Sequence, residues 1–214
     1  MPRGIFISFE GVEGVGKSTQ AARCAAFLEA RGNAVLRTRE PGGTALGEDV
    51  RRMLKFADYG GNMCGEAEAL LFSAARAQLV REKLVPALEA GTCVVADRFT
   101  DSSVAYQGAG RGLGAAEIAA LNRFATGGLA PDLTVLLDAP PELGFERARS
   151  RASEDAAGAA DRMETFPPAF YARVREAYLR LAAAEPRRFF LVDAAAGADE
   201  IFEKIRHECL RRFA

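Results

Sequence analysis

The stretch Gly11-Val12-Glu13-Gly14-Val15-Gly16-Lys17-Ser18 matches the phosphate-binding loop pattern G-x-x-x-x-G-K-[ST] at every fixed position. Residues 4–9 before it, Gly-Ile-Phe-Ile-Ser-Phe, form a short apolar run that is typical of a buried strand. Residues 18–31 after it have helical spacing and are followed by Gly32. Because a chance glycine-rich turn needs neither flank, this context favours a phosphate-binding loop.

The residue types of this loop suit a chain of phosphate groups. Gly11, Gly14 and Gly16 let the backbone turn its N–H groups inward, and the helix N-terminus adds roughly half a unit of positive charge. Lys17 is expected to reach the outer phosphates, and the Ser18 hydroxyl to bind Mg²⁺. The predicted nucleotide-binding set is Gly11, Val12, Glu13, Gly14, Val15, Gly16, Lys17, Ser18 and Thr19.

Length and composition predict one α/β domain that spans residues 1–214. The 28 basic and 29 acidic residues nearly cancel, so no overall field attracts nucleic acid or an anionic membrane, and we expect neither as a partner. No apolar run approaches about 18 residues, and Met1-Pro2-Arg3 leads into the first strand without a signal-peptide pattern. We therefore expect a cytoplasmic protein.

Cysteine and histidine give no sign of a metal centre. Cys24, Cys64, Cys93 and Cys209 are far apart and form no C-x-x-C pair, which argues against a zinc site and a disulfide framework. His207, the single histidine, lies in a charged C-terminal helix and is expected at the surface.

Five apolar runs alternate with helical patterns. Such alternation predicts a three-layer P-loop NTPase fold, in which a five-stranded parallel sheet is flanked by helices. Residues 100–114, rich in Ser, Gly, Tyr and Arg, are expected to be loop and turn. The expected strands are 4–9, 34–38, 92–96, 133–137 and 188–192, and the clearest helices are 18–31, 66–90, 115–124 and 142–150.

Charged residues follow most of these strands, at the edge of a parallel sheet where ligands bind. Asp97 and Arg98 leave the same buried strand together, so the acid can orient a water on Mg²⁺ while the arginine holds a second phosphate. The predicted metal-binding residues are therefore Ser18 and Asp97. Asp138 and Asp193 can equally be solubilising turn residues.

Small and acidic residues replace the apolar pattern over 151–160, a composition that suits a mobile flap. We place a mobile lid at about residues 148–162. Arg147, Arg149 and Arg151 lie just before this flap and at its start, and can close over a bound nucleotide or form a solvated helix end.

Four further motifs follow the phosphate-binding loop along the chain. They are Arg39-Glu40-Pro41-Gly42-Gly43-Thr44, Phe72-Ser73-Ala74-Ala75-Arg76, Asp97-Arg98-Phe99, and Asp101-Ser102-Ser103-Val104-Ala105-Tyr106-Gln107-Gly108 with Gly110-Arg111-Gly112 after it. Together with the loop, these motifs resemble thymidylate kinases of the bacterial kind, in the same order from about residue 4 to residue 192.

This resemblance implies that the γ-phosphoryl group of ATP passes to dTMP, with Mg²⁺ and without a covalent intermediate. It also implies a homodimer. Some members of the family carry a catalytic arginine in the loop where this chain has Gly14, so lid arginines would supply that charge. The implied catalytic residues are Lys17, Arg98, Arg151 and secondarily Arg149, with Arg162 in reserve.

The same resemblance implies a dTMP pocket. Phe72 would stack on the base, although it could also be plain core, and Arg76 one turn on would donate to a thymine carbonyl. Tyr106 would crowd the ribose 2′ position. The full implied set is Glu13 near the 3′-hydroxyl, Arg51 and Arg98 on the monophosphate, Ser103 and Gln107 on the base edge, Glu40 as an orienting residue, and Phe72, Arg76 and Tyr106.

Three other readings compete with this one. A kinase for another nucleoside monophosphate or a deoxynucleoside would keep the loop and lose the base-pocket residues. A GTP-binding switch would carry an Asn-Lys-x-Asp string, which this sequence lacks. A nucleic-acid-stimulated ATPase would need a basic stripe with interleaved aromatic residues, and none is found.

Overall fold

The computed structural model describes residues 3–56, 59, 63–154 and 166–213, with the backbone alone for residues 56 and 148–154. The strands are β1 (Phe6–Glu10), β2 (Val35–Arg39), β3 (Cys93–Asp97), β4 (Leu133–Asp138) and β5 (Phe189–Asp193). The helices are α1 (Lys17–Ala30), α2 (Ala45–Phe56), α3 (Gly65–Leu79), η1 (Val80–Leu84), α4 (Val85–Glu89), α5 (Thr100–Ser103), η2 (Val104–Gly110), α6 (Ala115–Thr126), α7 (Pro141–Glu154), α8 (Pro168–Ala184) and α9 (Ala198–Phe213).

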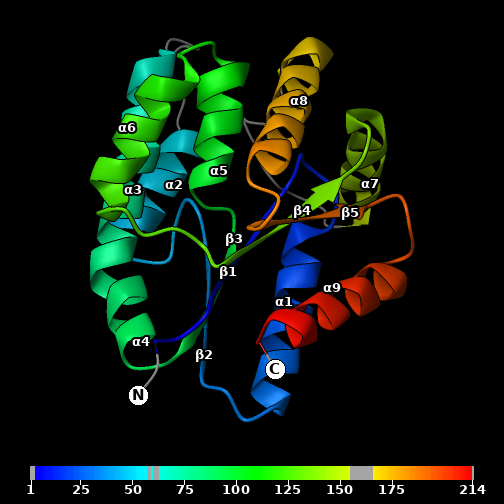
Figure 1. The fold of residues 1–214 in the computed structure, drawn as a ribbon. Helices are drawn as coiled ribbons and strands as arrows, with labels where there is room; N and C mark the ends of the chain where they lie inside the picture. The colour runs from blue at the N-terminus through cyan, green and yellow to red at the C-terminus, as the bar shows by residue number, and fades with distance from the viewer. Residues whose placement is uncertain (1–2, 57–58, 60–62, 155–165, 214) are drawn as a thin grey trace.

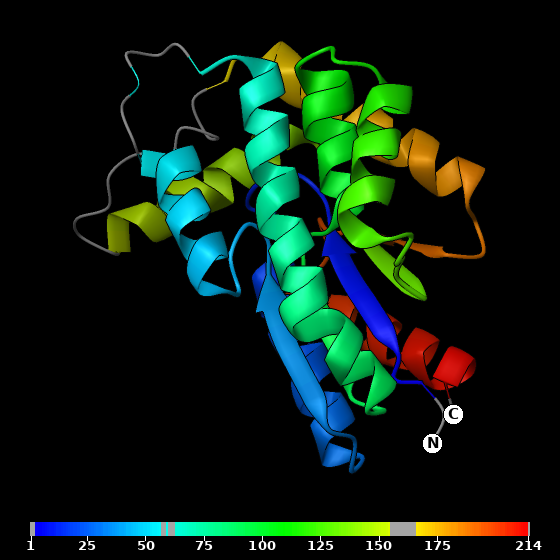
Figure 2. The ribbon, with the colours of Figure 1, turned by 90° about the vertical axis from the view of Figure 1, so that its left-hand side faces the viewer.

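Within the described ranges the strands form one five-stranded parallel sheet in the order β2-β3-β1-β4-β5. Helices α1 and α9 cover one face, while α3, α4 and α8 cover the other, so the molecule has three layers (Figures 1 and 2). The predicted fold class is therefore confirmed. No helix in the described ranges has the length and apolar character needed to cross a membrane.

The side chains of β1 point alternately to the two faces of the sheet, and both sets are buried, as expected for a central strand. Ile7 and Phe9 are fully buried among the apolar residues that pack on α1, and Phe6 belongs to the cluster beneath η1 and α4. A strand that is buried on both faces reads as a continuous apolar run, which is how β1 stands out in the sequence. It also fixes the phosphate-binding loop at the middle of the sheet edge.

The helix expected over residues 66–90 is continuous from Gly65 to Glu89, with a π-helical turn, η1, in its middle. Pro86 lies in the next turn. Because proline has no N–H, it cannot bond to the carbonyl four residues earlier, which is consistent with a local change of hydrogen-bonding pattern.

The prediction of loop and turn over residues 100–114 is wrong for most of that range, which forms α5 and η2. Glycine and serine lower local helix propensity, but here packing overrides it. Ala105, Tyr106 and Gln107 are buried, and η2 packs along α8. A Cβ on Gly110 would lie 2.6 Å from the Phe170 ring, so glycine is what allows this approach.

Candidate active site

The phosphate-binding loop connects β1 to α1 in the conformation that its glycines allow. Gly11, Gly14 and Gly16 have φ values of 138°, 73° and 95°, and no side chain caps the first turn of α1. Its free backbone N–H groups are the expected donors to an anion. Lys17 donates from Nζ to the Val12 carbonyl oxygen at 2.6 Å.

Burial, followed by the nearby positive charge of Arg98, lowers the pKa of Lys17 to about 8. The side chain is only 8% exposed. The loop thus holds a nearly buried cation in place against its own backbone before any ligand arrives. A phosphate oxygen can replace the Val12 carbonyl as the acceptor.

The same loop packs directly against the backbone of α7. A Cβ on Gly14 would lie 1.8 Å from the Gly144 carbonyl oxygen, and a Cβ on Gly144 would lie 2.1 Å from the Glu13 carbonyl oxygen. Both distances are far below van der Waals contact, so neither position accepts a side chain in this arrangement. The absence of a loop arginine at Gly14 therefore has a structural cause, which is the passage of α7.

Ser18 and Asp97 meet at the carboxyl edge of the sheet, where the Ser18 hydroxyl donates to a carboxylate oxygen of Asp97. A hydroxyl and a carboxylate are hard oxygen ligands of the kind that Mg²⁺ prefers. The described residues hold no cluster of three or more His, Cys, Asp or Glu suited to a metal. This composition fits Mg²⁺, which commonly takes one or two protein ligands and completes its shell with water and phosphate. Thr19 is exposed on the next position of α1.

A cavity of about 260 Å³ opens beside the loop. It brings together residues of the phosphate-binding loop and of α1, β2, α2, α3, β3, α5 and η2 that are far apart in the sequence. Every residue of the predicted dTMP pocket lines it. The lining residues are Glu13, Gly14, Lys17, Ser18, Arg39, Glu40, Pro41, Arg51, Lys55, Phe72, Arg76, Asp97, Arg98, Ser102, Ser103, Tyr106 and Gln107.

Arg98 lies between the loop and this cavity. Its backbone has φ 72°, an uncommon conformation for a residue with a side chain. The guanidinium donates to Glu13 Oε1 at 3.0 Å and to the Tyr106 hydroxyl at 3.1 Å, and it stacks 4.8 Å from the centre of the Tyr106 ring. Tyr106 in turn donates to the Glu13 carboxylate at 2.7 Å. The three side chains are therefore fixed as one unit.

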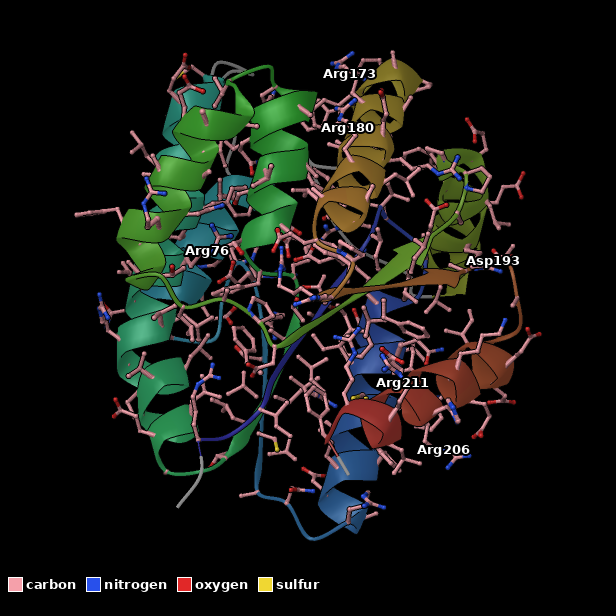
Figure 3. All side chains as sticks on the ribbon, viewed as in Figure 1. Arg76, Arg173, Arg180, Asp193, Arg206 and Arg211 are labelled. Atoms are coloured by element: carbon pink, nitrogen blue, oxygen red, sulfur yellow. The ribbon has the colours of Figure 1, made fainter. Side chains whose placement is uncertain are left out.

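Arg76 is the most thoroughly bonded side chain of the cavity wall, and Figure 3 shows it pointing from α3 into the interior. It is 1% exposed and donates to Glu40 at 2.8 Å, to Ser103 at 3.0 Å and to Asn122 at 2.7 Å. A longer contact of 3.3 Å reaches the Phe99 carbonyl. Each of its nitrogen atoms has a protein acceptor.

Glu40 precedes a cis peptide bond to Pro41 and is buried. Burial raises its pKa above the usual value, while Arg76 opposes that rise. Its Oε2 accepts from Arg76, but its Oε1 has no hydrogen-bond partner among the described residues. A buried acceptor without a partner is costly, so Oε1 is positioned to take a donor from a ligand or water.

Phe72, Arg51 and Gln107 complete the predicted residues of the wall. Phe72 also packs with the cluster around Val50 and Leu54, so it serves the core and the cavity at once. Arg51 donates to the Pro41 carbonyl oxygen at 2.9 Å. Gln107 donates to Glu68 Oε1 at 2.9 Å.

Arg149 and Arg151 lie on α7, but their side chains are outside those that the structure describes. The segment 155–165, which holds Arg162 and most of the predicted lid, is also outside the described residues. Arg147 on the same helix donates to the Ala194 carbonyl oxygen at 2.5 Å and so joins α7 to the end of β5.

The sequence interpretation missed three residues that hold the site together. Glu10 ends β1, Glu68 lies behind Gln107, and Tyr178 on α8 reaches Arg98 at 3.4 Å. Glu68 could have been found, because it lies one turn before Phe72 and two turns before Arg76 on the same helix face. Glu10 could have been noticed as a charge at the end of a buried strand.

Comparison with known proteins gives one consistent result. The family profile described as "Thymidylate kinase" matches residues 9–205. The similar proteins that bear the name thymidylate kinase include the following three. The one from Deinococcus radiodurans is 50% identical over 205 residues, or 96% of this chain and 96% of the relative. The one from Bifidobacterium longum (strain NCC 2705) is 48% identical over 207 residues, 96% and 97% respectively. The one from Solidesulfovibrio magneticus is 50% identical over 202 residues, 94% and 96%.

Proposed function

Because the chain belongs to the thymidylate kinase family, we propose how its site divides the work of dTMP phosphorylation. The chain is an ATP:dTMP phosphotransferase that gives dTDP and ADP. The observation that carries the assignment of roles is the cavity beside the phosphate-binding loop. Lys17, Arg98 and the aromatic side chain of Phe72 all line this cavity.

On the donor side, the backbone N–H groups of residues 11–19 bind the phosphates of ATP, and Lys17 binds the outer ones. Ser18 and Asp97 would hold Mg²⁺, which when bound neutralises phosphate charge. Arg149 and Arg151 would close over the transferring group. The protein forms no covalent intermediate, so its contribution is positioning and electrostatic stabilisation.

On the acceptor side, Arg98 and Arg51 bind the phosphate of dTMP, and Glu13 lies near that phosphate and the 3′-hydroxyl. Tyr106 closes the space beside the ribose 2′ position, where its fixed hydroxyl leaves little room for another. These groups hold the attacking phosphate oxygen in line with the donor, a geometry worth several orders of magnitude in rate.

The thymine base would stack on Phe72 with its polar edge toward Arg76, Ser103 and Gln107. Arg76 bonds to Ser103 in the free protein, so a thymine carbonyl would share that donor with the Ser103 hydroxyl. Glu40 holds Arg76 in orientation through Oε2 and keeps Oε1 open. Cytosine presents an amino group where thymine presents a carbonyl, so two donors would face each other and the affinity would fall.

The first prediction concerns substrate choice. ADP release with Mg²⁺-ATP, measured against dTMP, dUMP, dCMP, dGMP, AMP and thymidine, should be fastest by far with dTMP. An unpaired polar group in the base pocket costs about 1–3 kcal/mol, so dCMP should lose roughly tenfold to a hundredfold in kcat/KM. Equal rates across the panel would remove the base-reading roles and favour a kinase of broader acceptor range.

We also propose that the protein is a cytoplasmic homodimer whose single domain spans residues 1–214, with a lid at about 148–162. Four of the six large apolar side chains that are more than a third exposed in the described ranges come from α2, α3 and α6. These are Leu46, Met53, Leu70 and Phe124, with Phe124 86% exposed. The three helices lie side by side (Figure 2), so this surface suits a second copy of the chain.

Sedimentation velocity tests the dimer. The wild-type protein should sediment at twice the chain mass of 22.9 kDa. The double variant Leu70→Glu/Phe124→Glu should sediment as a monomer, because charges would be buried without partners. Leu191→Glu is the matched control, since Leu191 is 51% exposed on β5, and it should leave the dimer intact. A monomeric wild-type protein would refute the proposal.

A further inference from the structure

A buried carboxylate at the end of β1 has no part in the roles proposed above. Glu10 is fully buried at the end of β1. Its Oε1 accepts from the Phe99 backbone N–H at 2.8 Å, and its Oε2 accepts from the hydroxyls of Ser102 at 2.6 Å and Tyr178 at 2.8 Å. Burying a carboxylate is expensive unless it is paired, so this set of donors is what makes Glu10 tolerable.

The same two hydroxyls also face Arg98. Its Nη1 lies 3.1 Å from Ser102 Oγ and 3.4 Å from the Tyr178 hydroxyl. A hydroxyl has one proton and two lone pairs. When both hydroxyls donate to Glu10, their lone pairs are left for the guanidinium, and both accept from it. An ionised Glu10 thus sets the direction of every hydrogen bond between itself and Arg98.

The other end of the guanidinium is held by Glu13 and Tyr106, as described above. Arg98 is therefore gripped from two sides, and its backbone stays in the left-handed region, φ 72°. Such a conformation is strained for a residue with a side chain and persists only where the surroundings determine it. The bond from Phe99 N–H to Glu10 fixes the backbone immediately after Arg98.

We propose that Glu10, Ser102 and Tyr178 are positioning residues that aim Arg98 at the phosphate of dTMP. The inference rests on the proposed role of Arg98 and goes beyond it by naming the groups that make this arginine competent. Tyr178 belongs to α8, on the far side of the lid segment in sequence, so three separate elements, β1, α5 and α8, set the position of one side chain.

The surroundings of Glu10 add a pH dependence to this arrangement. Burial, followed by the nearby carboxylate of Asp101, raises the pKa of Glu10 to about 7. Asp101 is itself paired with Arg188, at 2.6 Å. The charged and titratable groups that face Glu10 are Arg98, Asp101, Tyr178 and, from α1, Lys17. Below pH 7 the protonated carboxyl competes as a donor, and Arg98 loses its oriented acceptors.

The test is steady-state kinetics of Glu10→Gln, which keeps the shape but replaces one acceptor oxygen with an NH₂ donor. The amide therefore cannot accept from the Phe99 N–H and from the two hydroxyls together. We expect KM for dTMP to rise about tenfold, because a hydrogen bond to a charged group is weakened, while KM for ATP changes less than threefold. In the wild-type protein kcat/KM for dTMP should fall as pH decreases through 7. In Glu10→Gln that fall should be smaller. Since dTMP has its own ionisation near pH 6, the comparison is between the two proteins at each pH.

Two further variants protect the test against misfolding of Glu10→Gln. Ser102→Ala and Tyr178→Phe each remove one relay hydroxyl and should raise KM for dTMP severalfold. Ser73→Ala is the matched control, because it removes a buried hydroxyl from α3 that does not line the cavity, and it should leave KM unchanged. The double variant Glu10→Gln/Ser102→Ala should cost less than the product of the single effects, since both act through Arg98.

The inference is overturned if all three variants fold and keep the KM and pH profile of the wild-type protein. That result is distinct from failure of the proposed function, in which the wild-type protein itself shows no preference for dTMP. Equal increases in KM for dTMP and for ATP would also overturn it, because they would indicate a general structural role.

Discussion

Replacing Arg151 with alanine should lower kcat by about 10³-fold or more, with a smaller loss for Arg149→Ala. Charge builds up on the transferred phosphoryl group, and an inserted arginine is worth about 10³ to 10⁵ in rate for this chemistry. The phosphate-binding loop cannot supply that arginine, because a side chain at Gly14 would collide with the Gly144 carbonyl oxygen. Helix α7, which causes this collision, is also the helix that carries Arg149 and Arg151.

Helix α7 thus both excludes an arginine from the loop and carries the arginines proposed to replace it. Its first turns pack on the loop through Gly144, and Arg147 is bonded to the Ala194 carbonyl oxygen. Arg149 and Arg151 follow on the same helix, and their action on the phosphates is what this substitution tests. Single-turnover kinetics at saturating ATP and dTMP would measure the effect on the chemical step.

The matched control for this experiment is Arg180→Ala. Arg180 lies on α8 below Arg173 (Figure 3), is 61% exposed and pairs only with Glu176 among the described residues. Its removal should leave kcat unchanged. If Arg151→Ala kept kcat within threefold of the wild-type value, the arginine would be a solvated helix end and the assignment would be wrong.

Much of the fold could be predicted because its signals are local. A strand buried on both faces is a run of apolar residues, so β1, β3 and β4 are visible in the sequence, and the loop after β1 has a fixed pattern. The segment 100–114 could not be predicted in the same way. Its helical form depends on burial of Tyr106 and Gln107 against α8 and α6, and local propensity contains no information about those contacts.

In the candidate site, too, local motifs could be predicted and long-range contacts could not. Motif positions identified which residues line the cavity, and all of the predicted dTMP-pocket residues are there. The partners that orient them could not be predicted, since Glu10 and Tyr178 are 168 residues apart in the chain yet lie within 2.8 Å of each other. The collision between Gly14 and Gly144 is likewise a property of packing, and it explains a sequence difference that the motif alone only records.

Replacing Lys17 with methionine should lower kcat/KM for ATP by about 10³-fold, with little change in the stability of the free protein. One preorganised donor to a developing charge is worth about 10² to 10³ in rate, and the loop lysine also contributes to binding of the outer phosphates. Lys17 is 8% exposed, and burial lowers its pKa to about 8, so keeping this charge in the loop costs free energy of folding. Methionine has a similar length and carries no charge to be desolvated.

The predicted contrast between activity and stability separates a catalytic lysine from a structural one. In the free protein Lys17 donates only to the Val12 carbonyl among the contacts that the structure describes, and a loop of glycines can lose that single bond cheaply. The temperature of thermal unfolding should therefore shift by only a few degrees.

Lys204→Met, which removes a half-exposed surface lysine paired with Glu200, is the control and should change neither the unfolding temperature nor kcat/KM for ATP. A large loss of stability in Lys17→Met with kcat/KM within tenfold of the wild-type value would make Lys17 a structural cation, and the phosphates of ATP would then have to be bound by the loop backbone and Arg98.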